Sequence, residues 1–198
     1  MHAFSLCKRA LLVVSLVVLS AGALIAAPSV PGFTFVPFGT VIGGAREVTT
    51  DPAGNVYSMG RDSGLIYKIS PAGVASVLAS LGPGFYVGPY FDPVSGDLLV
   101  STCNLGVGSE VFYRVNGVSG SISLYLSGRT CAGGFESEAA GNIYASTSVG
   151  GSVIKITPGG AISTYSSGMS FTDGMDFGAG GELYVADRGT NQVKRIPS

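Results

Sequence analysis

Tryptophan is absent from the 198-residue sequence, histidine occurs once, and charged residues make up only 12% of the chain. This charged share is about half of the usual ~25%, and the apolar share of 46% excludes a solvated, disordered chain. Because the formal net charge is −1, no basic field exists to attract nucleic acid, and no nucleic-acid partner is expected. Phosphate-binding loops and helical metal-hydrolase motifs are missing from the sequence as well.

The first 27 residues are typical of a secretory signal peptide. Lys8 and Arg9 precede the apolar run Ala10–Leu19, and small residues follow up to Ala27. The sequence therefore predicts a signal peptide over residues 1–27 and one domain over residues 28–198. The predicted location is secreted or periplasmic, with contact to a membrane only if the signal segment is not cleaved.

Cleavage would also remove His2, the single histidine. A mature chain without histidine cannot build a Ser-His-Asp triad, a Cys-His pair or a histidine-ligated zinc site, so no catalytic residue is assigned. The two remaining cysteines, Cys103 and Cys131, form an even pair in an exported chain, which favours a disulfide. Such a bridge is worth about 3–3.5 kcal/mol in the chain-entropy model. The alternative is a pair of buried thiols.

One sequence pattern occurs four times. A glycine, a polar residue and two apolar residues begin at Gly54, Gly96, Gly141 and Gly181, with spacings of 42, 45 and 40 residues. A second apolar strand follows each of these centres, and turn residues separate the runs. Four short strands in a period of about forty residues favour the blades of an all-β propeller. The predicted repeats cover approximately residues 45–80, 87–126, 133–165 and 172–196.

The two ends of the repeat array suggest how the propeller closes. The fourth repeat lacks a fourth strand, and the strand-like segment Phe33–Val41 precedes the first repeat. We expect residues 33–41 to complete the last blade, because this pairing would cover an edge that otherwise invites aggregation. The alternatives are a fragment of a larger ring and half of a ring that two chains build together.

Three segments resemble a known group of propellers. Asp51–Tyr57 (DPAGNVY), Ile154–Gly160 (IKITPGG) and Asp173–Asp187 (DGMDFGAGGELYVAD) resemble NHL repeats. They are also similar to the propellers of the virginiamycin B lyase and gluconolactonase/regucalcin superfamilies. The resemblance extends over residues 33–198 and implies the propeller architecture. It does not imply one function, because such blades carry enzymes, scaffolds and binding modules alike.

The resemblance also suggests two enzyme hypotheses. Virginiamycin B lyases use a histidine base, which the mature chain lacks. Gluconolactonase-like propellers hold a divalent cation such as Ca²⁺ at the axis, and Asp173 matches one of their ligands by its local motif. Its counterparts by counting from each repeat centre are Arg46, Val87 and Gly133, which are not ligands. A metal-dependent, lactonase-like hydrolase is therefore the alternative, and no cofactor is expected.

The favoured hypothesis is an exported, non-catalytic binding or scaffold propeller. Its partner would be a small molecule, a glycan or a protein, recognised by arginine and aromatic side chains on one loop face. An inactive fragment of a larger propeller is a further alternative. The candidate residues of the binding face are Arg46, Arg61, Phe85, Tyr86, Phe171, Asp173, Asp187 and Arg188.

Overall fold

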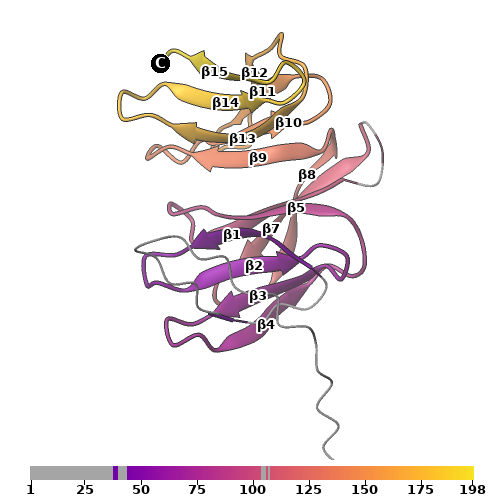
Figure 1. The fold of residues 1–198 in the computed structure, drawn as a ribbon, viewed down its shortest axis with the longest axis vertical. Helices are drawn as coiled ribbons and strands as arrows, with labels where there is room; N and C mark the ends of the chain where they lie inside the picture. Colours follow the sequence, from indigo (N-terminus) through magenta and orange to yellow (C-terminus); the bar gives the residue numbers. More distant parts are fainter. Residues whose placement is uncertain (1–37, 40–43, 104–105, 107) are drawn as a thin grey trace, which may run out of the picture. The chain divides into compact units, whose positions relative to one another are not determined.

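The computed structural model describes residues 38–39, 44–103, 106 and 108–198 (Figure 1). The predicted signal segment lies outside these residues, as does the predicted closing strand except for Phe38 and Gly39. Every regular element of the described residues is a β-strand. None of the described residues belongs to a helix long and apolar enough to cross a membrane. The strands are β1 (Ala45–Thr50), β2 (Val56–Gly60), β3 (Leu65–Ile69), β4 (Ala75–Ser80), β5 (Tyr86–Phe91), β6 (Asp97–Thr102), β7 (Glu110–Asn116), β8 (Ile122–Arg129), β9 (Ala132–Ser137), β10 (Ile143–Thr147), β11 (Ser152–Ile156), β12 (Ile162–Ser166), β13 (Thr172–Phe177), β14 (Leu183–Asp187) and β15 (Gln192–Ile196).

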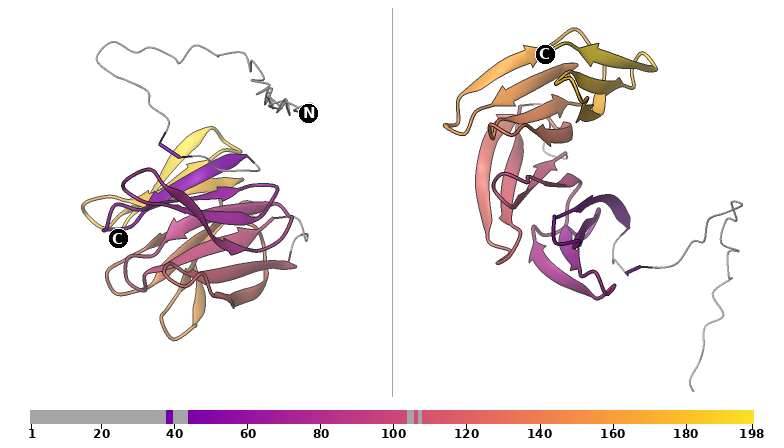
Figure 2. Two further views of the ribbon diagram at one scale, coloured as in Figure 1. Left: turned by 90° about the horizontal axis from the view of Figure 1, so that it is seen from below. Right: turned by 90° about the vertical axis from the view of Figure 1, so that its left-hand side faces the viewer.

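Consecutive strands pair in an antiparallel manner into four sheets. Strands β1–β4, β5–β8 and β9–β12 form four-stranded sheets, and β13–β15 form a sheet of three strands within the described residues. The sheets follow one another in chain order, from indigo to yellow in Figure 2. Each sheet is one blade, so the predicted four-bladed β-propeller is confirmed. We number the blades 1 to 4 along the chain.

The glycine at the centre of each repeat allows the turn between the first two strands of its blade. Gly54, Gly96, Gly141 and Gly181 all have a positive φ, between 76° and 82°. Residues with a side chain rarely adopt this conformation, whereas glycine adopts it without steric cost. In blade 1 the Gly54 amide donates to the Asp51 carbonyl over 3.0 Å, and the other three turns repeat this bond. The glycine spacing in the sequence therefore marks the start of the second strand of every blade.

The hydrophobic core consists of three clusters, one at each junction between consecutive blades. Between blades 1 and 2, for example, Tyr57 and Ile66 pack against Leu98 and Val115. The second cluster joins blades 2 and 3, and the third joins blades 3 and 4. Every blade therefore has a forward face, which packs on the following blade, and a backward face, which packs on the preceding blade. This packing is typical of repeat architectures, in which each unit contacts its neighbours only.

The tyrosine at the fourth residue of the repeat centre shows how a forward face works. Tyr57 is buried, and its hydroxyl lies within donating distance of two acceptors, the Asp51 carboxylate of its own blade at 3.0 Å and the Gly117 carbonyl of blade 2 at 3.2 Å. Tyr144 is buried between blades 3 and 4, where its ring packs edge-on against Phe177 at 5.1 Å. These two tyrosines therefore join consecutive blades.

Candidate functional site

A cavity of about 570 Å³ lies between the innermost strands of the four blades, β1, β5, β9 and β13. It is a polar cavity, because its lining includes three carboxylates and two hydroxyls beside several glycines. Cavities of this size suit small ligands. The residues that line it are Arg46, Glu47, Val48, Thr49, Val87, Gly88, Pro89, Tyr90, Gly133, Gly134, Phe135, Glu136, Asp173, Gly174 and Met175.

Each innermost strand has an irregular register at the cavity. The pairing shifts between Ala45 and Val48 in β1, and between Val87 and Tyr90 in β5. Strands β9 and β13 shift at the corresponding places. Such β-bulges bend a strand and re-aim its side chains, and they are frequent beside binding sites. The cavity is therefore surrounded by four bulges, one in the innermost strand of each blade.

Hydrogen bonds between neighbouring blades hold the cavity wall in place. The Glu47 carboxylate accepts a hydrogen bond from the Gly88 amide of the next blade. The Ser146 hydroxyl of blade 3 donates to the Asp173 carbonyl of blade 4 over 2.7 Å. At Gly133 a side chain would collide with the Thr172 carbonyl, so this close approach of two strands requires glycine.

Glu136 and Tyr90 form the polar centre of one wall. The Tyr90 hydroxyl lies 3.2 Å from the Glu136 carboxylate and 3.0 Å from the Ser137 hydroxyl. Burial, and next the nearby carboxylate of Asp176, raise the pKa of Glu136 to about 6. Burial also raises the pKa of Tyr90 to about 12. The Tyr90 hydroxyl is therefore a stable hydrogen-bond donor to a carboxylate that titrates close to neutral pH.

Glu47 lies in a similar environment on the other side of the cavity. Burial raises the pKa of the Glu47 carboxyl, and the negative charge of Asp173 acts in the same direction. The Gly88 amide and the Arg46 guanidinium oppose this rise. Because Glu47 and Asp173 influence each other, two carboxylates from blades 1 and 4 face a common space.

Arginine and aromatic side chains flank the cavity on the side of blades 1 and 2. The Arg46 and Arg61 guanidinium groups lie 5.1 Å and 4.2 Å from the centre of the Phe85 ring. Arg46 also forms an ion pair with Glu47 over 3.6 Å. The structure thus brings together three of the predicted binding-face residues, and Arg46 connects them to the cavity lining.

A second group of this kind lies in blade 4. The Arg188 guanidinium is 5.6 Å from the centre of the Phe171 ring and 3.1 Å from the Asp173 carboxylate. Asp173, the predicted metal ligand, is thus ion-paired with an arginine. Among the described residues, no three Asp, Glu, His or Cys side chains are grouped closely enough to hold a metal ion.

Two of the predicted binding-face residues are buried and hydrogen-bonded to nearby backbone. Tyr86 is buried in the junction between blades 1 and 2, and its hydroxyl donates to the carbonyls of Leu81 and Gly82, each at 3.1 Å. Asp187 is buried and accepts hydrogen bonds from the backbone amides of Ser170 and Phe171 at 3.1 Å and 3.3 Å. Burial acts to raise the pKa of Asp187, but a hydrogen bond from the Thr190 hydroxyl at 2.8 Å and these two backbone bonds lower it below its ordinary value. Both side chains therefore stabilise loops.

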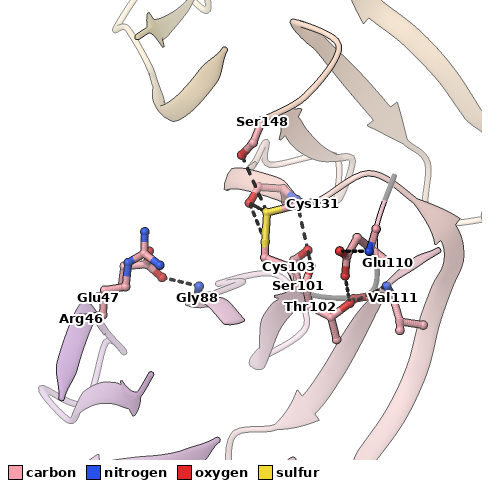
Figure 3. Close-up of a disulfide and its surroundings, with 12 residues drawn as sticks. Arg46, Glu47, Gly88, Ser101, Thr102, Cys103, Glu110, Val111, Cys131 and Ser148 are labelled. Carbon is pink, nitrogen blue, oxygen red and sulfur yellow. Dashed lines mark hydrogen bonds and ion pairs between the residues drawn. A yellow bond between two sulfur atoms is a disulfide. The ribbon is translucent and has the colours of Figure 1, made fainter. Parts of the chain in front are cut away.

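A disulfide joins Cys103, after β6 of blade 2, to Cys131, before β9 of blade 3 (Figure 3). Beside it, the Ala132 amide of blade 3 donates to the Ser101 hydroxyl of blade 2 over 3.1 Å. The covalent bridge and this hydrogen bond connect two blades at the same place. The predicted pairing of the two cysteines thus agrees with the structure, and it staples the junction nearest to the Glu136 wall.

Tyr90 was not predicted at the site, and Glu47 and Glu136 were placed on the same loop face but left out of the candidate residues because they lie off the counted register. Counting from the repeat centres led to Arg46, Val87, Gly133 and Asp173, which do lie at the cavity. The bulges change which neighbouring residue of each strand points inward, and this cannot be counted from the sequence. The available signal was the acidic residue next to two of the counted positions, at Glu47 and within the segment Gly133–Glu136.

Comparison with known proteins supports the fold. No protein-family model and no curated protein matches the chain. Among solved structures, a streptogramin B lyase is 15% identical with a TM-score of 0.63, over 79% of this chain and 55% of its own. Virginiamycin B lyase from Staphylococcus aureus is 15% identical with a TM-score of 0.63, over 80% and 57%. Regucalcin, a calcium-binding protein from Agrobacterium tumefaciens, is 17% identical with a TM-score of 0.64, over 78% and 57%.

These similarities show that the chain has the β-propeller fold, which virginiamycin B lyase and regucalcin also have. A nidogen bound to laminin is similar to the same degree, with 15% identity and a TM-score of 0.63. The chain spans slightly more than half of the length of each of these structures. At such identities the likeness concerns the fold alone, because one fold supports many functions.

Proposed function

We propose that this protein is an exported, non-catalytic binding propeller whose ligand places a cationic group in the central cavity. The observation that carries the proposal is the convergence of Glu47, Glu136 and Asp173 from three different blades on one cavity. Arg46 is the one cationic residue among those that line it, so the lining carries a net negative charge. A ligand with an ammonium or guanidinium group complements this charge.

The raised pKa values of Glu47 and Glu136 explain why a cation is the favoured ligand. Their carboxylates lose hydration by burial and repel neighbouring carboxylates. A cation placed between Glu47 and Glu136 supplies an opposite charge, which favours the ionised form of both carboxyl groups. The hydrogen bonds to it are charge-assisted, which makes them stronger than neutral ones.

The aromatic side chains beside the cavity would bind the remainder of the ligand. Phe171 is exposed, and Phe85 lies between two arginines at the other side. These rings offer apolar surface for a planar or aliphatic part of the ligand, such as the end of a peptide. Arg46 and Arg188 hold the Glu47 and Asp173 carboxylates in position through their ion pairs.

Titration calorimetry with two small probes tests the charge preference. At pH 7.5 we expect agmatine, an organic dication, to bind, whereas glutarate, a dianion of similar length, should not bind. Replacing Glu136→Gln removes one charge-assisted hydrogen bond, worth about 1.5–3 kcal/mol, and should weaken agmatine binding by roughly 10- to 100-fold. Asp62→Asn is the matched control, because the Asp62 side chain is 81% exposed and outside the cavity lining. Binding of glutarate in place of agmatine would contradict the proposal.

The proposed location rests on the disulfide and on the predicted signal segment. A disulfide persists in oxidising compartments outside the cytoplasm. We expect the chain isolated from the periplasm or the medium to begin close to Pro28, which mass spectrometry of the intact protein can measure. An uncleaved chain retained in the cell with free thiols would contradict this part of the proposal.

A further inference from the structure

Two arginines at the rim of the cavity, Arg46 and Arg61, share one aromatic ring. Their guanidinium groups, here called the rim pair, lie 5.1 Å and 4.2 Å from the centre of the Phe85 ring. Each pairs through Nε with the carboxylate that follows it in the sequence, Glu47 at 3.6 Å and Asp62 at 3.9 Å. Both distances are longer than a hydrogen bond. Within the part of the chain that the structure describes, neither group donates a hydrogen bond, so two like charges lie at one ring with unused donors.

Arg114 shows how this fold treats an arginine with a structural role. Its guanidinium group also lies against an aromatic ring, 4.3 Å from the centre of Tyr125. In addition, it donates to the Ser95 hydroxyl over 2.8 Å and to the Asp92 carboxylate over 3.4 Å. The Arg114 side chain is 21% exposed, whereas those of the rim pair are 40% and 48% exposed. The fold therefore satisfies Arg114, whereas the rim pair keeps donors that a ligand can use.

Backbone hydrogen bonds fix the segments that carry the rim pair and its ring. The Arg61 amide donates to the Gly44 carbonyl over 3.1 Å, which ties the end of β2 to the start of β1. The Phe85 carbonyl accepts a hydrogen bond from the Cys103 amide over 2.8 Å. Because Cys103 is bridged to Cys131, the loop that carries Phe85 is anchored to blades 2 and 3. A preformed site of this kind loses less conformational freedom on binding, which favours affinity.

The rim pair and the cavity carboxylates offer opposite charges at two places of one site. Arg46 lines the cavity from blade 1, and Glu136 lines it from blade 3. The Tyr90 hydroxyl, 3.2 Å away, holds the Glu136 carboxylate in position. A ligand with a cation alone would leave the rim pair without an anion. A zwitterion with a short spacer between its two charges complements both places.

We propose that the ligand is the C-terminal basic residue of a peptide, with its side-chain cation at Glu136 and Glu47 and its carboxylate on the rim pair. This inference rests on the proposed function, because the cation in the cavity orients the ligand. A guanidinium group binds a carboxylate through two parallel hydrogen bonds, which adds geometric specificity to the charge. Since Nε of each rim arginine faces its own neighbour, the two terminal nitrogens are the donors for the incoming carboxylate.

The end of a peptide suits the rim pair better than a free amino acid does. In a free amino acid, an ammonium group stands next to the carboxylate and would be placed beside two guanidinium groups. Like charges at such short distances repel each other. In a peptide the same nitrogen belongs to an uncharged amide. The chemistry of the rim therefore selects an acylated basic residue with a free carboxylate.

Calorimetry with two probes that differ in one group tests this assignment. Acetylarginine, acylated at its α-nitrogen, ends in a carboxylate, and acetylargininamide ends in an uncharged amide. At pH 7.5 we expect the acid to bind roughly 10- to 100-fold more tightly than the amide, the effect of one charge-assisted hydrogen bond. Arg61→Gln should reduce this ratio several-fold. Arg195→Gln is the matched control and should keep the ratio, because Arg195 is 64% exposed, pairs with a carboxylate at 4.0 Å and lies outside the cavity lining.

The outcomes separate this inference from the proposed function. Equal binding of the acid and the amide to the unmodified chain would overturn the inference and leave the cation site in place. An unchanged ratio in Arg61→Gln, or tighter binding of free arginine than of acetylarginine, would overturn it as well. Agmatine binding with neither acetylated probe bound would also overturn the inference alone. If agmatine and both acetylated probes fail to bind, the proposed function itself is wrong.

Discussion

Tyr144 and Tyr184 occupy the same position in consecutive blades, but only Tyr144 is enclosed by other rings. Tyr144 packs edge-on against Tyr165 at 4.9 Å and against Phe177 at 5.1 Å. The Tyr184 hydroxyl instead donates to Glu182, and its ring is partly exposed. The difference arises because blade 4 covers Tyr144, whereas no described residue covers Tyr184 in this way.

Replacing these tyrosines one at a time should separate their roles. Tyr144→Ala empties a packed junction and should lower the free energy of unfolding by about 3–5 kcal/mol, as large aromatic deletions do. Tyr184→Ala removes a partly exposed side chain and should cost less than about 1 kcal/mol. Urea unfolding measures both. Equal losses at the two positions would contradict the assignment of forward faces.

The bridge between Cys103 and Cys131 should contribute to stability at the junction of blades 2 and 3. Replacing both cysteines with serine releases a loop with a sequence separation of 28 residues, which the chain-entropy model values at about 3.5 kcal/mol. We expect the double variant to have a lower midpoint of thermal unfolding than the unmodified chain. Under reductant, the unmodified chain should unfold at the same lowered midpoint as the double variant. If reductant leaves the midpoint of the unmodified chain unchanged, the bridge does not constrain the fold.

The Glu136 carboxyl should make stability depend on pH between its unfolded and folded pKa values. Its pKa is raised to about 6 in the folded chain, so the folded state binds a proton more readily than the unfolded state. This group therefore favours folding below its unfolded pKa, and that contribution is lost as the pH rises through about 6. Glu136→Gln should stabilise the protein at pH 7.5, by an amount of order 1 kcal/mol or less after solvent screening.

Comparison of unfolding at two pH values checks this prediction. The gain from Glu136→Gln should be present at pH 7.5 and disappear at about pH 3, where the native carboxyl is protonated in both the folded and the unfolded state because this pH lies well below its ordinary pKa of 4.5. Asp62→Asn should show no such difference, because its side chain is largely exposed. A gain of equal size at both pH values would indicate a packing effect and would contradict the raised pKa of Glu136.

The turns and the junctions followed from the sequence, because they depend on residues that repeat. The glycines at the repeat centres have a positive φ in all four blades, so their spacing marked the blades directly. Tyr86 was predicted on the binding face, whereas the structure buries it at the start of β5; its orientation depends on which side of the sheet that strand presents first. Glu47 and Glu136 were set aside as off register, because the bulges that shift the inward-pointing residue cannot be counted from the sequence. Local propensity does not encode such shifts in register.

The ion pairs of Arg46 and Arg188 predict the response of the cavity to a double substitution. Removing both guanidinium groups releases the Glu47 and Asp173 carboxylates, which would then be free to contact a bound cation. Arg46→Ala with Arg188→Ala should leave the fold intact, since both side chains are at least 40% exposed, and should strengthen agmatine binding several-fold. Loss of agmatine binding would instead show that the arginines hold the ligand themselves.

The most direct test of the central claim is the number of protons released when a cation enters the cavity. Agmatine binding is measured by calorimetry at pH 6 in two buffers that differ in ionisation enthalpy, and again at pH 8. Because a bound cation lowers the pKa of Glu136 from about 6, we predict release of roughly half a proton at pH 6 and almost none at pH 8. Agmatine binding with no proton release at either pH, or with proton uptake at pH 6, would contradict cation binding by the Glu136 cavity.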